Sequence, residues 1–348
     1  MVQSLFNTSL ALVQAPMAGV QDAKLAASVS EAGGLGSLPC AMLSLQQLAE
    51  QLELLTAATN KPYNLNFFCH TTCDYSNEQK QRWHKLLQPY FNEFNIASST
   101  LNMNASRQPI TQQIIDIIAP HKPPVVSFHF GLPNAKLLEQ IKAWGAKIIA
   151  TATTVNEAKW LVANGADAVI AQGLEAGGHR GHFLSMDLTL HTSTAELVKN
   201  CVAAVPAPII AAGGIASADD VRQMQQLGAS GVQIGSAYLL CNEATTSPLH
   251  RNAVLAQQSV WGNTAITNLL SGRAARGINN RIMNELNFIS DLAAPFPYAS
   301  IAITALRKKA EARGASDFSP LWCGQKYLPR VNMSAAEITH DLMAKWLI

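Results

Sequence analysis

Eight short apolar segments recur along the first 240 residues, and most are separated by stretches of helical composition. Each segment is a nearly continuous apolar run, which is typical of parallel strands buried on both faces. Charged residues make up 14% of the chain and hydrophobic residues 48%, as such strands require. The pattern predicts an α/β protein with a parallel sheet. We expect the strands at 11–15, 33–39, 63–68, 123–131, 145–151, 165–171, 207–214 and 228–235.

Polar residues, glycines and a methionine stand at the carboxyl ends of many of these segments. In an eight-stranded β/α barrel all such ends surround one mouth, where active sites are built. We therefore expect an eight-stranded β/α (TIM) barrel rather than the alternative, an open doubly wound sheet. The residues concerned are Met17, Asn66, His129, Gln172, Gly213 and Gln233.

The alternation of predicted strands and helices stops after Leu240. Residues 241–348 have a mostly helical composition interrupted by glycines and prolines. We expect residues 1–240 to form the barrel core, and residues 241–348 to form a helical insertion or cap that completes the substrate pocket. The last residues of the chain are expected to pack against the barrel.

Charge and hydropathy exclude several classes of partner. The net charge of +2 comes from 25 basic and 23 acidic residues that form no basic stripe, so nucleic acid binding has no support. No positive segment precedes an apolar run at the N-terminus, and no apolar run reaches about 18 residues. The six cysteines are scattered and are interpreted as free thiols in a reducing compartment. We expect a cytoplasmic protein without a membrane partner.

Two glycine turns, at 212–215 and 234–237, follow the last two predicted strands. In β/α barrels these two loops commonly bind a phosphate, because glycine lets backbone N–H groups approach its oxygens. The alternative is that the glycines only make tight turns. Their occurrence at consecutive strand ends favours a phosphate, carried by a substrate or by flavin mononucleotide (FMN).

The segment 171–182 follows the sixth predicted strand and contains four glycines, a carboxylate and two histidines. Its glycines place His179 and His182 on a loop, where a histidine can bond a substrate or transfer a proton near neutral pH. Glu175 and Asp187 make no recognisable metal pattern with them, so we predict no metal site. We assign the catalytic role to His179 and a structural role to His182.

Three further features lie near strand ends. The amide of Asn66 can donate to and accept from a planar heterocycle. His129, between two phenylalanines, is either a core histidine or a residue facing the substrate. The spacing of Cys69 and Cys73 is neither a redox nor a haem motif, so we assign no function to it.

Six segments taken together resemble the nitronate monooxygenase family, formerly called 2-nitropropane dioxygenase. The resemblance extends from about residue 10 to residue 330. The segments 272–277 and 321–325 also resemble the branch that acts on nitronates such as propionate 3-nitronate. The six segments are Ala15-Pro-Met-Ala-Gly19, Asn66-Phe-Phe68, Phe128-His-Phe-Gly-Leu-Pro133, Gln172-Gly-Leu-Glu-Ala-Gly-Gly-His-Arg-Gly181, Ala211-Ala-Gly-Gly-Ile215 and Gln233-Ile-Gly-Ser236.

The resemblance implies a β/α barrel with non-covalently bound FMN, in which a nitronate and O2 give a carbonyl compound and nitrite. His179 would face the substrate, with His129 and Tyr298 as further substrate-binding residues. In some relatives the segment matching 297–307 carries tyrosines and a lysine, of which only Tyr298 is found here. We expect a monomer or homodimer. The implied FMN-binding residues are Met17, Ala18, Asn66, Gln172, Gly177, Gly178, Gly213, Gly214, Gln233, Ile234, Gly235 and Ser236.

Two alternatives stay open. An FMN-dependent enoyl reductase or quinone reductase that uses NAD(P)H would share the barrel, and the reductase family shares the Pro-Met-Ala-Gly and Glu-Ala-Gly-Gly-His motifs. Arg180 and the segment 322–325 favour the nitronate enzyme over it. The other alternative is a flavin-binding scaffold without enzymatic activity.

Overall fold

Eight parallel strands form the barrel predicted from the sequence. The computed structural model describes residues 2–101, 107–256 and 263–347. The strand order is β1-β9-β8-β6-β5-β4-β3-β2, and a parallel bridge between Val13 and Leu35 joins its two ends. Each of the eight predicted segments overlaps one of these strands, and β5 and β6 extend one residue beyond theirs. The strands are β1 (Leu12–Gln14), β2 (Gly36–Pro39), β3 (Tyr63–Phe68), β4 (Val125–His129), β5 (Lys147–Ala152), β6 (Ala168–Gln172), β8 (Ile209–Ala212) and β9 (Gly231–Ile234).

Helices surround the barrel, and their starts follow from local capping. Asp22 and Ser44 accept bonds from backbone amides of the first helical turn, as does Ser217, and this satisfies donors that a helix start leaves unpaired. The outer helices are α2 (Ala23–Glu31), α3 (Leu45–Ala58), α5 (Gln112–Ile118), α6 (Ala135–Ala143), α7 (Val155–Ala163), α8 (Thr194–Ala204), α9 (Ala218–Gln226) and α13 (Ala335–Met343). Helix α13 packs against α2 and α9, so the end of the described chain lies on the barrel.

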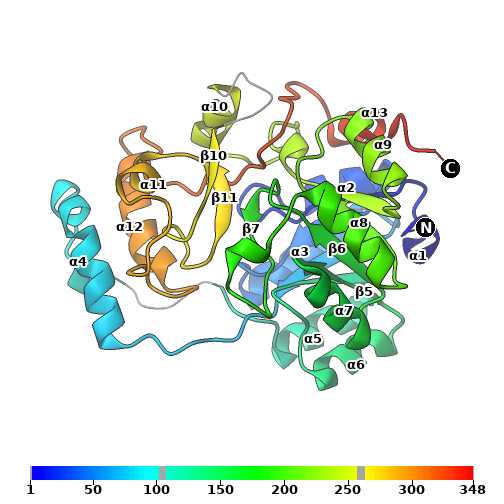
Figure 1. The fold of residues 1–348 in the computed structure, drawn as a ribbon, viewed down its shortest axis with the longest axis horizontal. Helices are drawn as coiled ribbons and strands as arrows, with labels where there is room; N and C mark the ends of the chain where they lie inside the picture. The colour runs from blue at the N-terminus through cyan, green and yellow to red at the C-terminus, as the bar shows by residue number, and fades with distance from the viewer. Residues whose placement is uncertain (1, 102–106, 257–262, 348) are drawn as a thin grey trace.

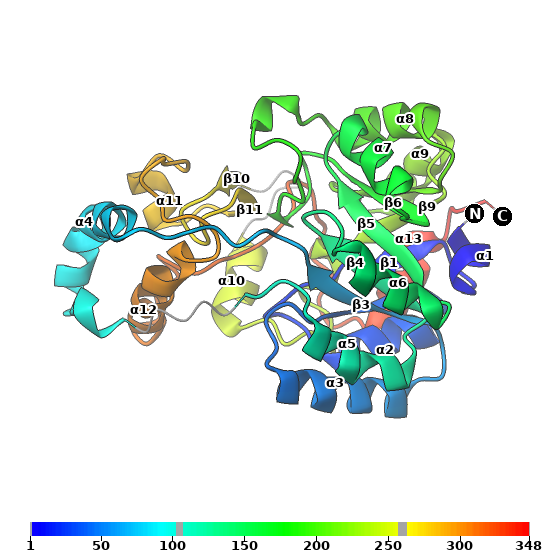
Figure 2. The same ribbon diagram turned by 90° about the horizontal axis from the view of Figure 1, so that it is seen from below.

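A second hydrophobic cluster lies beside the barrel (Figures 1 and 2). Its core comes from α4 (Asn77–Glu93) and α12 (Ala299–Glu311), which pack against each other, with α11 (Arg281–Glu285) alongside. The cluster thus draws on the chain before residue 240 as well as after it, and the division of the chain at that residue stays a prediction. Helix α10 (Pro248–Ala256) lies between this cluster and the barrel in Figure 2.

A small antiparallel sheet was not expected from the sequence. It joins β7 (Gly178–His179) to β11 (Ala275–Ile278), which pairs in turn with β10 (Thr264–Thr267). Strands of two to four residues are too short to show the alternation that predicts a strand. The pairing of Ala275 with His179 ties the histidine loop to the second part of the chain.

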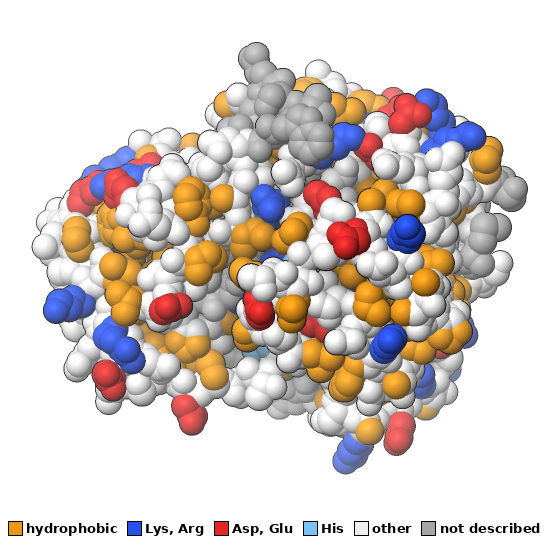
Figure 3. Space-filling model, in the orientation of Figure 1, with side chains coloured by type: hydrophobic (Ala, Val, Ile, Leu, Met, Phe, Trp, Pro, Cys, Tyr) orange, Lys and Arg blue, Asp and Glu red, His pale blue; other side chains and the backbone are white. Residues whose placement is uncertain are grey.

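The charged side chains are dispersed on the face of the molecule that Figure 3 shows. On the face in Figure 3 basic and acidic side chains are interspersed with apolar ones, and no patch of a single sign covers it. No helix within residues 2–101, 107–256 and 263–347 has the length and apolar character needed to cross a membrane.

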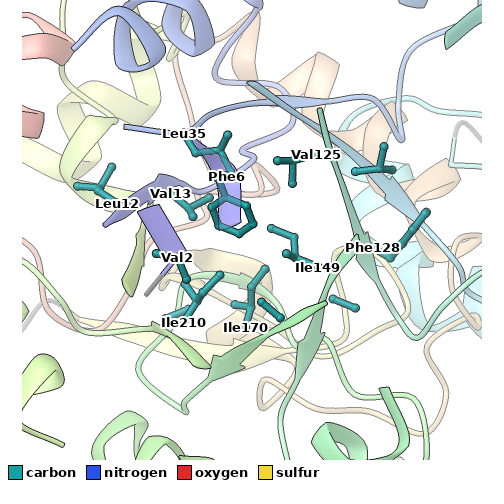
Figure 4. Packing of buried hydrophobic residues seen from close by; sticks show 14 of the residues in the cluster. Val2, Phe6, Leu12, Val13, Leu35, Val125, Phe128, Ile149, Ile170 and Ile210 are labelled. Carbon is teal, nitrogen blue, oxygen red and sulfur yellow. The ribbon is translucent and has the colours of Figure 1, made fainter. Parts of the chain in front are cut away.

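The short helix α1 (Val2–Phe6) closes one end of the barrel. Figure 4 shows Phe6 surrounded by apolar side chains that come from strands around the barrel. Phe6 is 3% exposed, so its ring is part of the barrel core. With this end filled, the opposite end, formed by the carboxyl ends of the strands, is where a ligand can enter. The labelled strand side chains include Val13, Val125, Ile149, Ile170 and Ile210.

Candidate active site

A cavity of about 400 Å³ opens at the carboxyl ends of the barrel strands. Its volume is within the range of pockets that hold a cofactor or small ligand. His129, His179 and all twelve residues predicted to bind FMN line it, while Tyr298 does not. Tyr298 instead stacks on Tyr75 with ring centroids 4.7 Å apart, so its position gives no support to the predicted role in substrate binding.

The glycine turns bring backbone close to neighbouring segments. At Gly213, where φ is +121°, a Cβ atom would lie 2.7 Å from Oγ1 of Thr194 and 2.8 Å from the backbone N of Ala176. At Gly177 a Cβ atom would lie 2.5 Å from the carbonyl carbon of Cys323. No other residue fits these contacts, because every other side chain begins with a Cβ. The glycines therefore expose backbone to the cavity while the loops pack tightly behind it.

The C-terminal segment around Gly324 completes the turn after β9. The backbone N–H of Gly324 donates to Oγ of Ser236 at 2.8 Å. Lys326 lines the same cavity and forms an ion pair with Asp220 on α9. Residues far apart in sequence thus meet at the predicted phosphate-binding turn.

Gln172 and His129 hold the backbone of the histidine loop. The Gln172 side chain donates to the carbonyl of His179 at 2.9 Å and accepts from the N–H of Gly181 at 2.8 Å. Nε2 of His129 lies 3.1 Å from the same His179 carbonyl, and because a carbonyl only accepts, this nitrogen carries the proton. Nδ1 then accepts from the hydroxyl of Thr151 at 3.1 Å.

Both ring nitrogens of His129 are therefore engaged by the protein. Burial lowers the pKa of His129 to about 3, and Arg273 acts in the same direction, against the bond to His179. The ring is neutral and fixed in one tautomer. His129 lines the cavity, and its two ring nitrogens hold Thr151 and the loop of His179, so this geometry gives no support to substrate binding through a ring nitrogen.

The His179 ring stands in the cavity wall against Ser271, Phe296 and Trp322. Its Nε2 lies 2.8 Å from Oγ of Ser271, which also lies 3.2 Å from the Arg273 carbonyl. Donation of the one hydroxyl proton to that carbonyl leaves Nε2–H of His179 to donate to Oγ. Burial lowers the pKa of His179 well below 6.5, and the positive charge of Arg107 adds to the effect. The imidazole is neutral at neutral pH.

Arg180 stabilises the backbone at the start of the histidine loop. It is fully buried, and its guanidinium donates to the carbonyls of Gly173 at 2.7 Å and Gln172 at 2.8 Å. His182 is buried beside His191 and lies outside the cavity lining. Among the described residues no group of three or more His, Cys, Asp or Glu side chains could hold a metal ion.

Several residues of the site had no signal in the sequence. Ser271 follows β10 and reaches His179 only because β7 pairs with β11. Arg107 and Arg307 line the cavity from segments 200 positions apart, so no local spacing connects them. Phe68 could have been found, since it lies two positions after Asn66 on the same strand and, like it, lines the cavity.

Comparisons with known proteins agree with this geometry. The model of the family described as nitronate monooxygenase matches residues 1–345. A probable nitronate monooxygenase from Staphylococcus saprophyticus is 37% identical over 98% of this chain and 96% of its own length. A nitronate monooxygenase from Pseudomonas aeruginosa is 35% identical over 95% of each chain.

A solved structure shows the same similarity in three dimensions. Nitroalkane oxidase from Streptomyces ansochromogenes superposes with a TM-score of 0.86 at 29% sequence identity, covering 99% of this chain and 97% of that one. The chain therefore belongs to the nitronate monooxygenase family, a family of oxidoreductase enzymes.

Proposed function

We propose that this chain catalyses the FMN-dependent oxidation of alkyl nitronates, such as propionate 3-nitronate, by O2 to a carbonyl compound and nitrite. The observation that carries the proposal is the neutral, buried His179 in the wall of a cavity that glycine turns border. Family membership supports the reaction class.

The residues around the cavity fit FMN. The side-chain oxygen Oε1 of Gln233 is buried there and has no hydrogen-bond partner among the described residues, and such an acceptor calls for a donor on a ligand. Gly178, with φ of +74°, has open space where a Cβ would project. The turns at Gly213–Gly214 and Gly235–Ser236 would hold the phosphate, with Lys326 nearby as a cation.

The other predicted contacts would surround the flavin ring. Asn66 donates to Oγ of Ser127 at 2.9 Å, which leaves its carbonyl oxygen to accept from a ligand. Bound FMN would accept electrons from the nitronate. The remaining proposed contacts are Met17, Ala18, Gln172, Gly177, Gly178 and Ile234.

His179 would stabilise the nitronate anion. Once protonated, the ring would have a second N–H, at Nδ1, to donate to the anion, and a buried wall of aromatic rings leaves little competition from water. Phe296 and Trp322, whose ring centroids lie 5.5 and 5.4 Å from that of His179, help to keep water away. A bound anion also raises the pKa of a nearby histidine, so the ring can take up a proton as the substrate binds.

Two measurements on the purified protein test the proposal. We expect an absorption spectrum of bound flavin, FMN as the extracted cofactor, and nitrite release from propionate 3-nitronate in the presence of O2. Anaerobic mixing with NADH separates the alternatives: fast bleaching of the flavin together with no nitrite from any nitronate would favour a reductase. A yellow protein that shows neither activity would favour a scaffold.

The last part of the proposal concerns the location and the oligomeric state of the enzyme. All six cysteines are free, in keeping with a reducing compartment. We include in the proposal a cytoplasmic location and a monomer or homodimer as the working form.

A further inference from the structure

Glu157, on helix α7, has a buried side chain that the function proposed above does not use. It is 1% exposed and stands three positions after Thr154, the residue that caps α7. Its Oε2 accepts from the backbone N–H of Thr153 at 2.7 Å and from the Thr153 hydroxyl at 2.8 Å. Bonds of this kind satisfy free donors at a helix start, and they occupy only one of the two carboxylate oxygens.

The other oxygen holds the chain just after the histidine loop. Oε1 of Glu157 accepts from the backbone N–H of Phe183 at 2.6 Å and from that of Leu184 at 3.2 Å. On α13, Glu337 makes the same two cap bonds, from the N–H and the hydroxyl of Ser334, at an exposed position. Capping alone therefore does not account for the burial of Glu157.

A chain of hydrogen bonds leads from Oε2 back to Arg180, the residue next to His179. The Thr153 hydroxyl donates its proton to the carboxylate, so it can only accept from Nε2–H of His191, 3.1 Å away. Nδ1 of His191 then accepts from Nε–H of Arg180 at 3.4 Å. Burial lowers the pKa of His191 to about 4, which agrees with the single ring proton that this arrangement needs. The carboxylate thus sets the direction of every bond in the chain.

The charge of Glu157 also acts on both arginines that hold the loop. Arg180 donates to two backbone carbonyls at the start of the loop, and Arg273 donates to the carbonyl of His182. Burial lowers the pKa of each guanidinium to about 10, and the negative charge of Glu157 acts in the opposite direction. Because a buried cation is costly without an opposite charge, removal of the carboxylate would destabilise both contacts.

We propose that Glu157 is a positioning residue for His179: its two oxygens hold the backbone after the histidine at two points and so fix the imidazole in the cavity wall. This rests on the proposed function, in which His179 meets the nitronate. A group that stabilises charge must be held in place before the substrate arrives, and a displacement of about 1 Å can lower a rate about 100-fold. Glu157 supplies that support from outside the cavity lining.

Two substitutions at Glu157 separate its helix cap from its hold on the loop. Glu157→Asp keeps the charge and can still cap α7, as Asp220 caps α9 by accepting from the N–H of Ser217 at 3.0 Å. Its side chain is one methylene shorter, so it cannot reach Phe183 as well. Glu157→Gln keeps the length but has a single oxygen, so one of the two contacts loses its acceptor. Glu157→Gln carries the test should Glu157→Asp not fold.

Glu337→Asp and Glu337→Gln are the matched controls. Glu337 makes the same cap bonds on α13 and lies outside the cavity lining. These substitutions therefore alter a helix cap of the same kind without altering the histidine loop. All four variants are compared with the wild type as purified, after urea unfolding has shown that each is folded.

The ¹⁵N resonances of the His179 ring report its position without turnover. The proteins are labelled with ¹⁵N-histidine, and the His179 signals are identified by their absence from His179→Asn. In the wild type we expect one set of signals, from a neutral ring protonated at Nε2 and bonded to Ser271. Both Glu157 variants should shift or split these signals, because the ring is no longer held in one place. Both Glu337 variants should keep the wild-type signals.

Turnover is measured on the same proteins. Nitrite release at saturating propionate 3-nitronate should fall at least about tenfold in both Glu157 variants and stay at the wild-type level in both Glu337 variants. Wild-type ring signals or wild-type turnover in the Glu157 variants would overturn the positioning role. If the ring signals change and the wild type releases no nitrite, the proposed reaction fails while the positioning role stands.

Discussion

At the scale of the residue, the site depends on imidazoles whose protonation is set by burial and by hydrogen bonds. His129 and His179 both line one cavity, and both ring nitrogens of His129 are bonded to protein, while Nε2 of His179 is bonded to Ser271. Two identical side chains therefore differ in their surroundings: His129 holds the loop, while His179 is the residue proposed to meet the ligand.

The role of His179 leads to a first prediction. His179→Asn should retain FMN but lower nitrite release by about 100-fold or more, because the asparagine cannot take up a proton. FMN content and steady-state kinetics measure the two effects. His340→Asn, on the outer helix α13, is the control and should match the wild type. Wild-type turnover in His179→Asn with FMN retained would refute the assignment.

Single residues also mark the limits of prediction from sequence. The neighbours of His129 are compatible with either a core or a substrate-facing histidine, and only its distances to Thr151 and His179 show that both ring nitrogens contact protein. The role predicted for Tyr298 rests on a resemblance, and the packing of α12 turns its ring to Tyr75 instead. The direction in which a side chain points at the start of such a helix depends on tertiary packing, and a local sequence pattern carries no information about that packing.

At the scale of the element, the turns after β8 and β9 are where the fold and the proposed cofactor meet. Their glycines were visible in the sequence because a glycine pair at a strand end is a local signal. The sheet of β7, β11 and β10 was not visible, since its strands are short and the paired residues of β7 and β11 lie 96 and 98 positions apart. Ser271 could not be predicted for that reason, although it makes the closest polar contact of His179.

The phosphate turn yields the second prediction. Gly214 has φ of +66°, and a Cβ atom placed on it would lie 3.0 Å from Cβ of Glu175. Gly214→Asp should therefore weaken FMN binding at least about tenfold, through steric block and repulsion of the phosphate. The bound flavin is measured by its absorbance after purification.

A second glycine separates cofactor loss from backbone strain. Gly145 also has a positive φ, of +91°, with open space where its Cβ would project, and it precedes β5 at the barrel end opposite the cavity. Gly145→Asp should suffer similar backbone strain and still purify with FMN. If Gly214→Asp also purifies fully yellow, the turn does not hold the phosphate.

At the scale of the whole molecule, the barrel is a packed core with one closed and one open end. The prediction of eight strands succeeded because each is a buried apolar run between helices with recognisable caps. The insertion of α1 into the closed end could not be foreseen, because five residues at a chain end carry too short a pattern.

The closed end gives the third prediction. Phe6→Ala should reduce the free energy of unfolding by about 3–5 kcal/mol, because it removes a ring from the centre of the packed barrel end. Ser4→Ala, at an exposed position of the same helix, should change it by less than about 0.5 kcal/mol. Urea unfolding of the three proteins measures the difference. Equal stabilities would mean that α1 does not contribute to the core.

Stability should fall in mild acid. Burial lowers the pKa of His70, His191 and His250 to about 4 and that of His129 and His182 to about 3. In the unfolded chain a histidine titrates near 6.5, so below that pH the unfolded state binds protons that the folded state does not. The stabilisation is complete above about pH 6.5 and is lost as the pH falls towards the folded values.

Each such histidine lowers the free energy of unfolding by up to about 1.4 kcal/mol for every pH unit below its pKa in the unfolded chain. Urea unfolding at pH 7.5, 6.0 and 5.0 should therefore show the free energy of unfolding decreasing steeply below pH 6.5. His182→Gln removes one of the titrating groups and should show a shallower decrease than the wild type. A free energy of unfolding that is flat or rises from pH 7.5 to 5.0 would mean that these histidines take up protons within the fold, and the neutral imidazole assigned to His179 would then lose its support as well.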